Sequence, residues 1–439
     1  MTIINRIQPK RWHPLFIIFA GGLLVRWLTY YYFYHSLITS GGLHFSPTAD
    51  EANTYEVLAR QLLAGNGFAQ ALFSFRPPLQ PMFIALVYMI FDTADPLVAA
   101  FVQTFVGAGV GVVTFFVARE LRMPRFVQSC AGLLVALDPA SIIVGLTLMA
   151  ETLSNFFVAS GTLFTVRLIR RATLRDACAA GGCFALATLA RPTTIYLWVL
   201  LVLVIMRMVP RFLPKAAAFV AAFAIGVLPW YIRNQVYHNV FTFSTIGNFN
   251  LLFYGAVSVK HWATGIPPQE LEEQFSYELD RRLGRATSRD TYDYSTKWKF
   301  RRSNDPQVNA EITAMAIDVF REYPFAYIFT APLKVIRMYV FTNYLLPFQT
   351  IHWLEIIYNM TFYALSICGM VWTKIRREFV VMTVTLVPIA YFSLIPLLSG
   401  SSFGMDTRAR TPFTFCIAIL AAQGLLWLLR LRQRPQSVQ

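Results

Sequence analysis

The stretch Thr411–Leu429 reads TPFTFCIAILAAQGLLWLL and carries no charged residue. A helix rises ~1.5 Å per residue, so ~20 apolar residues cover the hydrocarbon core of a bilayer. Comparable stretches recur from Pro14–Tyr34 onward, and the 439-residue chain is 56% hydrophobic and only 14% charged. A soluble domain has about 25% charged residues. The sequence therefore predicts an all-α protein that crosses the membrane many times, and it excludes an ordinary soluble globule.

Ten apolar segments approach the length that a transmembrane helix needs. They lie at roughly 14–35, 96–118, 127–146, 151–169, 177–190, 193–209, 216–235, 354–373, 379–397 and 411–429. Two further segments, Leu79–Phe91 and Phe325–Leu346, are respectively short and interrupted by charges, which favours helices on the membrane surface. We therefore expect about ten transmembrane helices, within a range of ten to thirteen, together with juxtamembrane helices and a large outer loop.

Clusters of Lys and Arg give an independent test of this topology, because short cytoplasmic loops are enriched in them. With ten spans and a cytoplasmic N-terminus, six clusters that hold half of the 38 basic residues all fall inside. The clusters are Arg6/Lys10/Arg11, Arg119/Arg122/Arg125, Arg167/Arg170/Arg171/Arg175, Arg207/Arg211/Lys215, Lys374/Arg376/Arg377 and Arg430/Arg432/Arg434. The net charge of +15 thus reflects orientation, and it gives no reason to expect a nucleic-acid partner. We expect a multi-pass protein of the cell (inner) membrane with both termini in the cytoplasm.

The same topology divides the chain into three parts. Residues 1–235 form an N-terminal catalytic transmembrane module with a first outer loop at 36–95, residues 236–324 form an extracytoplasmic loop or cap, and residues 325–439 form a juxtamembrane helix and C-terminal transmembrane helices. Glu270–Leu283 has a helical pattern within the cap. The cap is polar, and we expect it to contain too few apolar residues for a core of its own.

Three carboxylates are expected on the outer side. Asp50 and Glu51 precede a helical segment that also carries Tyr55, and Glu151 lies at the outer mouth of the fourth span. Asp50 is suited to cap that helix and Glu51 to its first turn, which is the structural alternative. Acids in such a place could instead deprotonate an attacking hydroxyl, and Asp50 with Glu51 could hold a divalent metal ion.

Five arginines are also expected on the outer side, against the usual orientation bias. They are Arg76, Arg191, Arg233, Arg408 and Arg410. Each needs a partner, and one of the three outer carboxylates or Asp406 could provide it. A guanidinium group also matches the geometry of a phosphate. Several arginines beside a few carboxylates therefore indicate a site for an anionic lipid phosphate that is joined to a polar group.

A series of short motifs runs in order along most of the chain. The motifs are Asp50-Glu51 with Tyr55, Gly65-x-Gly67-Phe68, Arg76-Pro77-Pro78-x-x-Pro81, Ala150-Glu151, Ala190-Arg191-Pro192, Pro229-Trp230-x-x-Arg233-Asn234 and Arg408-x-Arg410-x-Pro412. In this order they resemble the motifs of the C-type-fold (GT-C) membrane glycosyltransferases. The resemblance is to the bacterial branch similar to protein O-mannosyltransferases and the lipid A aminoarabinose transferase.

The resemblance implies a GT-C-like fold and a polyprenyl-phosphate-sugar-dependent glycosyltransferase, either a hexosyl- or a pentosyltransferase. Such an enzyme moves a sugar from a polyprenyl-phosphate-linked donor to an extracytoplasmic acceptor with inversion, at a site on the outer face. Carried over residue by residue, the resemblance makes Asp50 or Glu51 the base or metal ligand, Glu151 the second acid and Arg76 the phosphate ligand. It also implies substrate contacts for a wider group, which comprises Tyr55, Arg191, Arg233, Asn234, Arg408 and Arg410.

Two questions stay open at the level of the sequence. A transporter or flippase of lipid-linked sugars would also need many helices and basic residues near a phosphate, although it should place its charges midway along the helices. The acceptor could be a cell-envelope glycan, a lipid or a protein. No P-loop or dinucleotide fingerprint occurs, so we expect no nucleotide or organic cofactor, and at most a divalent metal ion.

Overall fold

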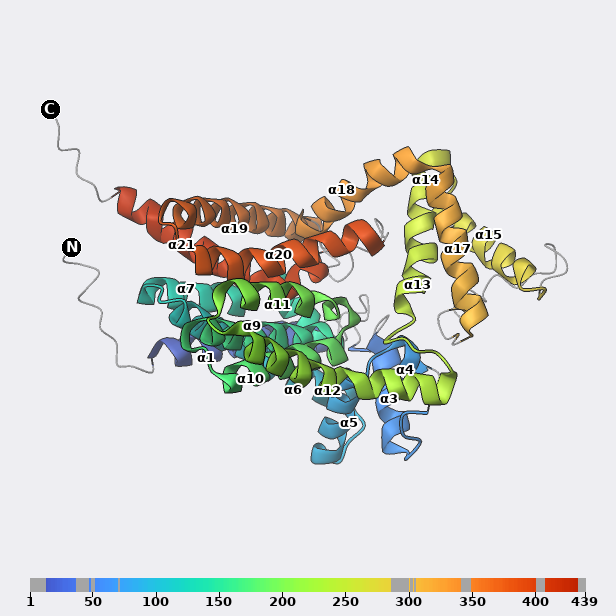
Figure 1. The fold of residues 1–439 in the computed structure, drawn as a ribbon, viewed down its shortest axis with the longest axis horizontal. Coiled ribbons are helices and arrows are strands. Elements are labelled where there is room, and N and C mark those ends of the chain that lie inside the picture. Colours follow the sequence, from blue (N-terminus) through green and yellow to red (C-terminus); the bar gives the residue numbers. More distant parts are fainter. Residues whose placement is uncertain are drawn as a thin grey trace.

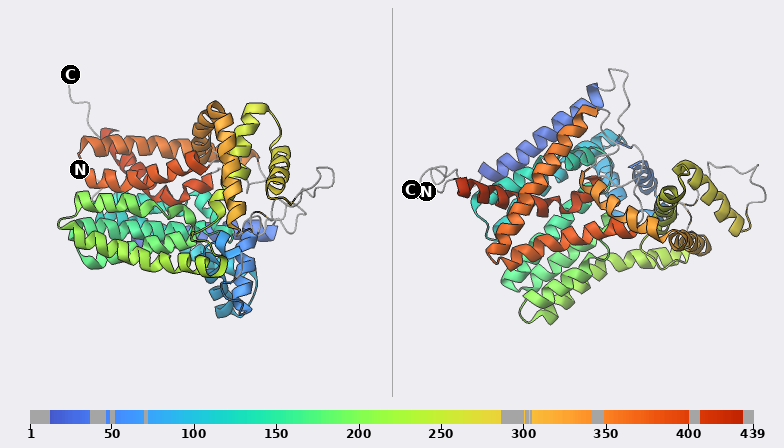
Figure 2. Two further views of the ribbon diagram at one scale, coloured as in Figure 1. Left: turned by 45° about the vertical axis from the view of Figure 1, so that its right-hand side comes forward. Right: turned by 90° about the horizontal axis from the view of Figure 1, so that it is seen from above.

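The computed structural model describes residues 13–36, 47–48, 52–69, 72–285, 300, 303, 305–340, 349–399 and 407–432. Within these residues every regular element is a helix. Figure 1 shows that the long helices run side by side along the longest axis of the molecule. Shorter helices gather at one end of this bundle, opposite to the end at which the first long helix begins and the last one finishes (Figures 1 and 2).

Seven of the described helices are long and apolar enough to cross a membrane. They are α1 (His13–Tyr31, continued by η1, Tyr32–Ser36), α6 (Pro96–Glu120), α9 (Glu151–Arg171), α12 (Phe212–His238), α19 (Gln349–Ile375), α20 (Phe379–Ser399) and α21 (Thr414–Arg432, preceded by η5, Thr407–Phe413). A pair bent by 44° would be an eighth span, namely α7 (Arg125–Ala136) with α8 (Pro139–Leu146). The prediction of an all-α polytopic membrane protein is therefore confirmed.

The remaining two predicted spans correspond to shorter helices. The segment predicted at 177–190 is α10 (Leu174–Ala190), and the one at 193–209 is η2 (Pro192–Thr194) followed by α11 (Leu197–Met208). Both lie in the bundle, because α10 packs against α9 and α12 while α11 packs against α12 and α20. Each of the ten predicted segments thus corresponds to helix within the bundle.

Helices α19 and α21 approach each other closely at two glycines. A Cβ atom added to Gly369 would lie 1.8 Å from the carbonyl oxygen of Leu420, and one added to Gly424 would lie 2.0 Å from that of Leu365. No side chain fits at these distances, so only glycine permits the crossing. Membrane helices pair in this way because small residues let their backbones come into contact. The crossing holds α21, and with it the turn η5 at its beginning.

Two groups of shorter helices lie beyond one end of the bundle, which the sequence predicts to face outward and which we call the outer end. The first group is α3 (Ala52–Leu63), α4 (Leu72–Phe75) and α5 (Leu79–Phe91). In Figure 1, α5 runs across the direction of the long helices, as expected for a helix on a membrane surface. Its last three residues, Met89, Ile90 and Phe91, are exposed. The other segment predicted to lie on the membrane surface, Phe325–Leu346, is described as far as Val340. That part forms α18 (Pro324–Val340), in which Phe325 and Phe329 are exposed.

The described residues between α12 and α18 pack around an apolar core of their own, which we call the cap core. The helices of this cap are α13 (Ile246–Asn250), η3 (Leu251–Ala256), α14 (Val257–Thr264), α15 (Pro268–Arg282) and α17 (Pro306–Glu322). The buried residues of the cap core are Phe249, Leu252, Phe253, Ala256, Val257, Val259, Leu271, Phe275, Leu279, Phe300, Val308, Ile312, Met315, Ala316 and Val319, joined by Phe75 of α4.

The expectation that this segment has too few apolar residues for a core was wrong. Helices α15 and α17 carry apolar residues three or four positions apart on one face and polar residues on the other. The mean hydropathy of the segment is low and does not show these apolar faces. The faces come into contact only when the helices fold together. The predicted helix Glu270–Leu283 is confirmed as α15.

Candidate active site at the outer end of the bundle

Glu151, Arg191 and Arg408 meet at the outer end of the bundle. Glu151 is the first residue of α9, Arg191 follows the last residue of α10, and Arg408 lies in η5. One carboxylate oxygen, Glu151 Oε1, lies 3.3 Å from Arg191 Nη1 and 3.4 Å from Arg408 Nε. Three segments that are far apart in the sequence therefore share one ion-pair cluster.

Burial differs between the acid and the two bases of this cluster. The Glu151 side chain is 3% exposed, whereas those of Arg191 and Arg408 are 19% and 24% exposed. A carboxylate in the first turn of a helix is also stabilised by the helix dipole. The three groups together carry one excess positive charge, and the guanidinium groups face outward more than the acid does. The cluster is thus suited to bind an anion at its open side.

Arg76 and Tyr55 form a second polar group in the first outer loop. Arg76 lies between α4 and α5 and is 3% exposed. Its Nε donates to Thr54 Oγ1 at 3.2 Å and its Nη1 to the Tyr55 hydroxyl at 3.5 Å. The guanidinium carbon also lies 5.0 Å from the centre of the Tyr55 ring and 4.9 Å from that of Phe75. The two residues that the sequence predicted to bind substrate in this loop are therefore in contact.

A further carboxylate belongs to α3. The Tyr88 hydroxyl of α5 donates to Glu56 Oε1 at 3.3 Å, and Arg60 forms an ion pair with the same oxygen. Burial, and next the neighbouring Glu56 carboxylate, raises the pKa of the Tyr88 phenol, which therefore stays protonated at neutral pH. These contacts tie α3 to α5, and α5 in turn packs against α10, whose end carries Arg191.

Asp50 and Glu51 lie outside the described residues. The described part of helix α3 starts at Ala52, directly after them, so their predicted roles as cap and first-turn charge are not tested. No group of three or more His, Cys, Asp or Glu side chains suited to a metal ion occurs among the residues that the structure describes. Glu151 already forms ion pairs with two arginines, so the described part of the site does not by itself fit a divalent metal.

Arg233 and Asn234 bind main-chain carbonyl groups. Arg233 Nε donates to the carbonyl oxygen of Phe68 at 2.8 Å, and its Nη1 donates to Asn234 Oδ1 at 2.6 Å. Asn234 Nδ2 donates to the carbonyl oxygens of Thr242 and Phe243. In this arrangement the two residues join the first outer loop, at Phe68, and the beginning of the cap to α12. Their contact with substrate stays a prediction.

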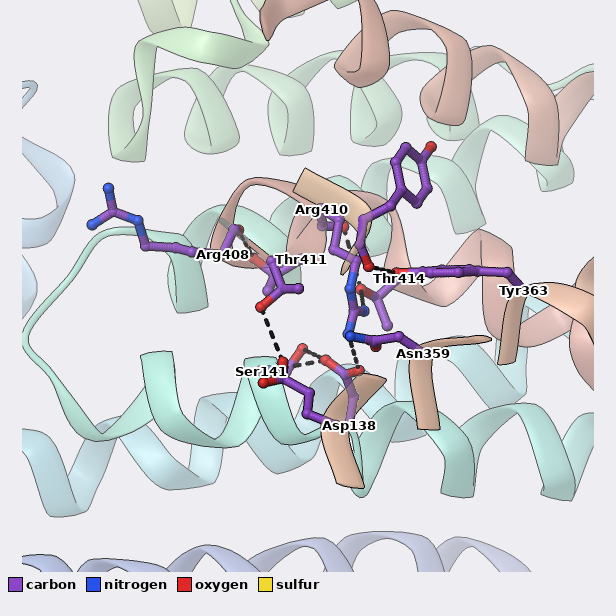
Figure 3. A network of polar contacts seen from close by, with 11 residues as sticks. Asp138, Ser141, Asn359, Tyr363, Arg408, Arg410, Thr411 and Thr414 are labelled. Atoms are coloured by element: carbon purple, nitrogen blue, oxygen red, sulfur yellow. Dashed lines mark hydrogen bonds and ion pairs between the residues drawn. The ribbon is translucent and has the colours of Figure 1, made fainter. Parts of the chain in front are cut away.

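Arg410 lies in a buried polar network that sequence reasoning missed (Figure 3). Its Nη2 lies 3.0 Å from Asp138 Oδ1 and donates to Asn359 Oδ1 at 2.9 Å, while its Nη1 donates to Thr414 Oγ1 at 3.1 Å. The Arg410 and Asp138 side chains are both fully buried. The sequence contained one indication of this network, because the acid Asp138, followed by Pro139, lies within the predicted span 127–146.

Among the residues that the structure describes, ion pairing, the structural alternative for the outer arginines, accounts for at least three of the five. Arg191 and Arg408 pair with Glu151, and Arg410 pairs with Asp138. Arg26, which the sequence places within the first span, is also buried, and its Nη1 donates to the carbonyl oxygen of Ala136 at 2.6 Å. A ligand-binding role for Arg191 and Arg408 is compatible with their pairing, because both remain partly exposed.

Comparisons with known proteins identify the fold. No family model matches the sequence, and no curated protein sequence matches it. The oligosaccharyltransferase of Archaeoglobus fulgidus in its apo form superposes with a TM-score of 0.54 at 12% identity, over 95% of this chain and 51% of the archaeal one. The same enzyme tethered to an acceptor peptide superposes with a TM-score of 0.53 at 13% identity, over 96% and 50% of the two chains.

A third structure of the archaeal enzyme, AglB in complex with an inhibitory peptide and a dolichol-phosphate, gives a TM-score of 0.51 at 12% identity, over 96% of this chain and 52% of the other. The chain thus spans about half the length of the archaeal enzyme. ArnT from Cupriavidus metallidurans superposes more loosely, with a TM-score of 0.42 at 13% identity over 93% and 77% of the chains, below the level at which a common fold follows. The chain therefore has the C-type glycosyltransferase fold that its ordered motifs predicted.

Proposed function

We propose that this protein is a membrane glycosyltransferase that moves a sugar from a polyprenyl-phosphate-linked donor to an acceptor outside the cytoplasm. The observation that carries the proposal is the cluster of Glu151 with the partly exposed Arg191 and Arg408 at the outer end of a GT-C fold. A site that must bind a phosphate needs an excess of positive charge, and this cluster carries one excess positive charge. Arg76 in the adjacent loop would add a further cation.

In the proposed reaction an acceptor oxygen or nitrogen attacks the anomeric carbon of the donor sugar. The bond from that carbon to the phosphate oxygen breaks, the phosphate leaves with the bonding electrons, and the configuration inverts. The acceptor's proton passes to a carboxylate, for which Asp50 or Glu51 is the candidate. The guanidinium groups of Arg191, Arg408 and Arg76 stabilise the negative charge on the departing phosphate.

Glu151 has a separate part in this proposal. Because it pairs with Arg191 and Arg408 at once, its carboxylate fixes the direction of both guanidinium groups. Loss of that carboxylate would leave the two arginines free to turn away from the phosphate. A divalent metal ion belongs to the proposal only at Asp50 and Glu51, and chelation of the membrane fraction with EDTA tests it through loss of transfer.

Lipid phosphates are supported as ligands by the archaeal neighbour, which has been captured with a dolichol-phosphate. That enzyme has also been captured with an acceptor peptide, but this chain spans only about half of it, so a peptide, a lipid and a glycan all remain acceptors to test. We place the site on the outer face of the inner membrane. Basic residues in the last turns of α9 and α21, at the opposite end of the bundle, support this orientation.

Mass spectrometry of lipid-linked sugars tests the proposal. A strain that lacks the gene is complemented with the wild type, with Glu151→Gln, or with Arg281→Gln as a control. Arg281 is an exposed cap residue that pairs with Glu278. We expect the donor to accumulate with Glu151→Gln but not with the control. Identical profiles for Glu151→Gln and wild type would contradict the proposal, and donor trapped on the inner leaflet would favour a flippase instead.

A further inference from the structure

We infer that Asp138 is a positioning residue, which holds Glu151 and Arg408 in register through Arg410. The inference rests on the proposed function for its kinetic test but not for its structural one. It begins at η5, where two arginines in alternate positions point in different directions. Arg408 reaches Glu151 in the cluster with Arg191, which we call the outer cluster. In Figure 3, Arg410 points toward Asp138, whereas Arg408 points away from it.

Arg410 anchors η5 to the interior of the bundle. Its guanidinium group binds side chains from three other places, namely Asp138 before α8, Asn359 of α19 and Thr414 of α21. All four side chains are buried, and away from water charge-assisted hydrogen bonds are strong and geometrically demanding. The position of Arg408, two residues earlier in the same turn, follows from that anchor.

The other carboxylate oxygen of Asp138 caps a helix. Asp138 is the N-cap of α8, where Oδ2 accepts from the backbone nitrogen of Ser141 at 2.9 Å and from the Ser141 hydroxyl at 2.7 Å. The cap fixes the 44° bend between α7 and α8. Helix α8 and a short turn then lead directly to Glu151, the first residue of α9.

One carboxylate therefore joins the two segments that deliver the two partners of the outer cluster. Oδ2 holds the segment that leads to Glu151, and Oδ1 holds the turn that carries Arg408. A contact between Thr411 Oγ1 and Asn155 Oδ1 at 3.5 Å is a second connection between η5 and α9. If the pair served stability alone, its loss would leave the arrangement of the remaining folded molecules unchanged.

The structural test is a cryo-electron microscopy structure of the full chain with Asp138→Asn. We expect the contact between Glu151 Oε1 and Arg408 Nε, 3.4 Å in the wild type, to lengthen beyond ion-pair distance. A variant that keeps this contact would overturn the inference, whatever reaction the protein catalyses. Should Asp138→Asn fail to fold, Arg410→Lys takes its place with the same expected result, because it keeps the buried positive charge but shortens the side chain that reaches Asp138.

The kinetic test is a cycle of Asp138→Asn, Arg408→Gln and the double variant, with turnover measured per folded molecule. We expect Asp138→Asn to lower kcat ~10-fold in the wild type but less than ~2-fold in the Arg408→Gln background, because it acts through Arg408. Effects that multiply would overturn the inference. Absence of donor cleavage in the wild type would instead refute the proposed function, while the structural test would still decide this inference.

A matched control comes from the opposite end of the same helix pair. Thr373 of α19 donates to Gln423 Oε1 of α21 at 2.7 Å, and both side chains are buried. Thr373 lies ~20 Å from Asn359 along the axis of α19, given the rise per residue of a helix. Thr373→Val should lower thermal stability with kcat and the outer contact unchanged, and a fall in kcat equal to that of Asp138→Asn would overturn the inference.

Discussion

Replacement of Arg410 by Met should cost about 3 kcal/mol of unfolding free energy. Arg410 and Asp138 are fully buried and their charged atoms lie 3.0 Å apart. At an effective dielectric constant of ~20 their attraction is about 5 kcal/mol, and removing one partner of such a pair costs ~3–5 kcal/mol. Asp138 keeps its two hydrogen bonds from Ser141, so we expect the lower part of that range.

Unfolding in mixed micelles of increasing SDS content, followed by circular dichroism, measures this change. The double variant Asp138→Asn/Arg410→Gln removes both charges and keeps hydrogen-bonding groups of similar shape. It should be less destabilised than Arg410→Met, by roughly 1–2 kcal/mol, because no unpaired charge remains buried. A loss below about 1 kcal/mol for Arg410→Met, or a double variant less stable than the single one, would refute this reasoning.

Three further predictions concern other parts of the molecule. Gly424→Ala should destabilise the bundle by about 1–3 kcal/mol in the same SDS titration, because its methyl group would collide with the carbonyl oxygen of Leu365; unchanged stability would contradict the close crossing. Burial lowers the pKa of Lys334 from 10.5 to about 8, so the folded state binds fewer protons between these values and stability should rise from pH 8 to pH 10.5. Lys334→Met should abolish most of that rise, about 3 kcal/mol, and a rise that persists would point to another group. Phe275→Ala should cost about 3 kcal/mol within the cap alone, seen as faster hydrogen exchange in α15 and α17, and equally faster exchange in the bundle would show that the cap core is not separate.

The sequence predicted the class of fold because the decisive property is local. Runs such as Thr411–Leu429 must form helices in a bilayer whatever they pack against. The same holds for α15, whose bounds follow from its own spacing of apolar residues. The cap core could not be predicted in this way, because Phe253 and Val308 belong to it only through contacts between helices.

The sequence predicted which residues belong to the candidate site, but not which of them form ion pairs with one another. Glu151, Arg191 and Arg408 were all expected on the outer side, but their meeting depends on how three distant segments fold. Arg410 differs from Arg408 by two positions, and a turn of helix directs it inward to Asp138, 272 residues earlier. No local pattern distinguishes these two arginines, so substrate binding was predicted for both from the sequence.

Binding of undecaprenyl phosphate to the purified protein tests the central claim most directly. Its dissociation constant is measured for the wild type, for Arg191→Gln, for Arg408→Gln and for the cap control Arg281→Gln. A charge-assisted hydrogen bond is worth ~1.5–3 kcal/mol, so each site variant should bind at least ~10-fold more weakly. The control should bind like the wild type. Equal affinities for all four proteins would contradict the claim that Arg191 and Arg408 form the lipid-phosphate site.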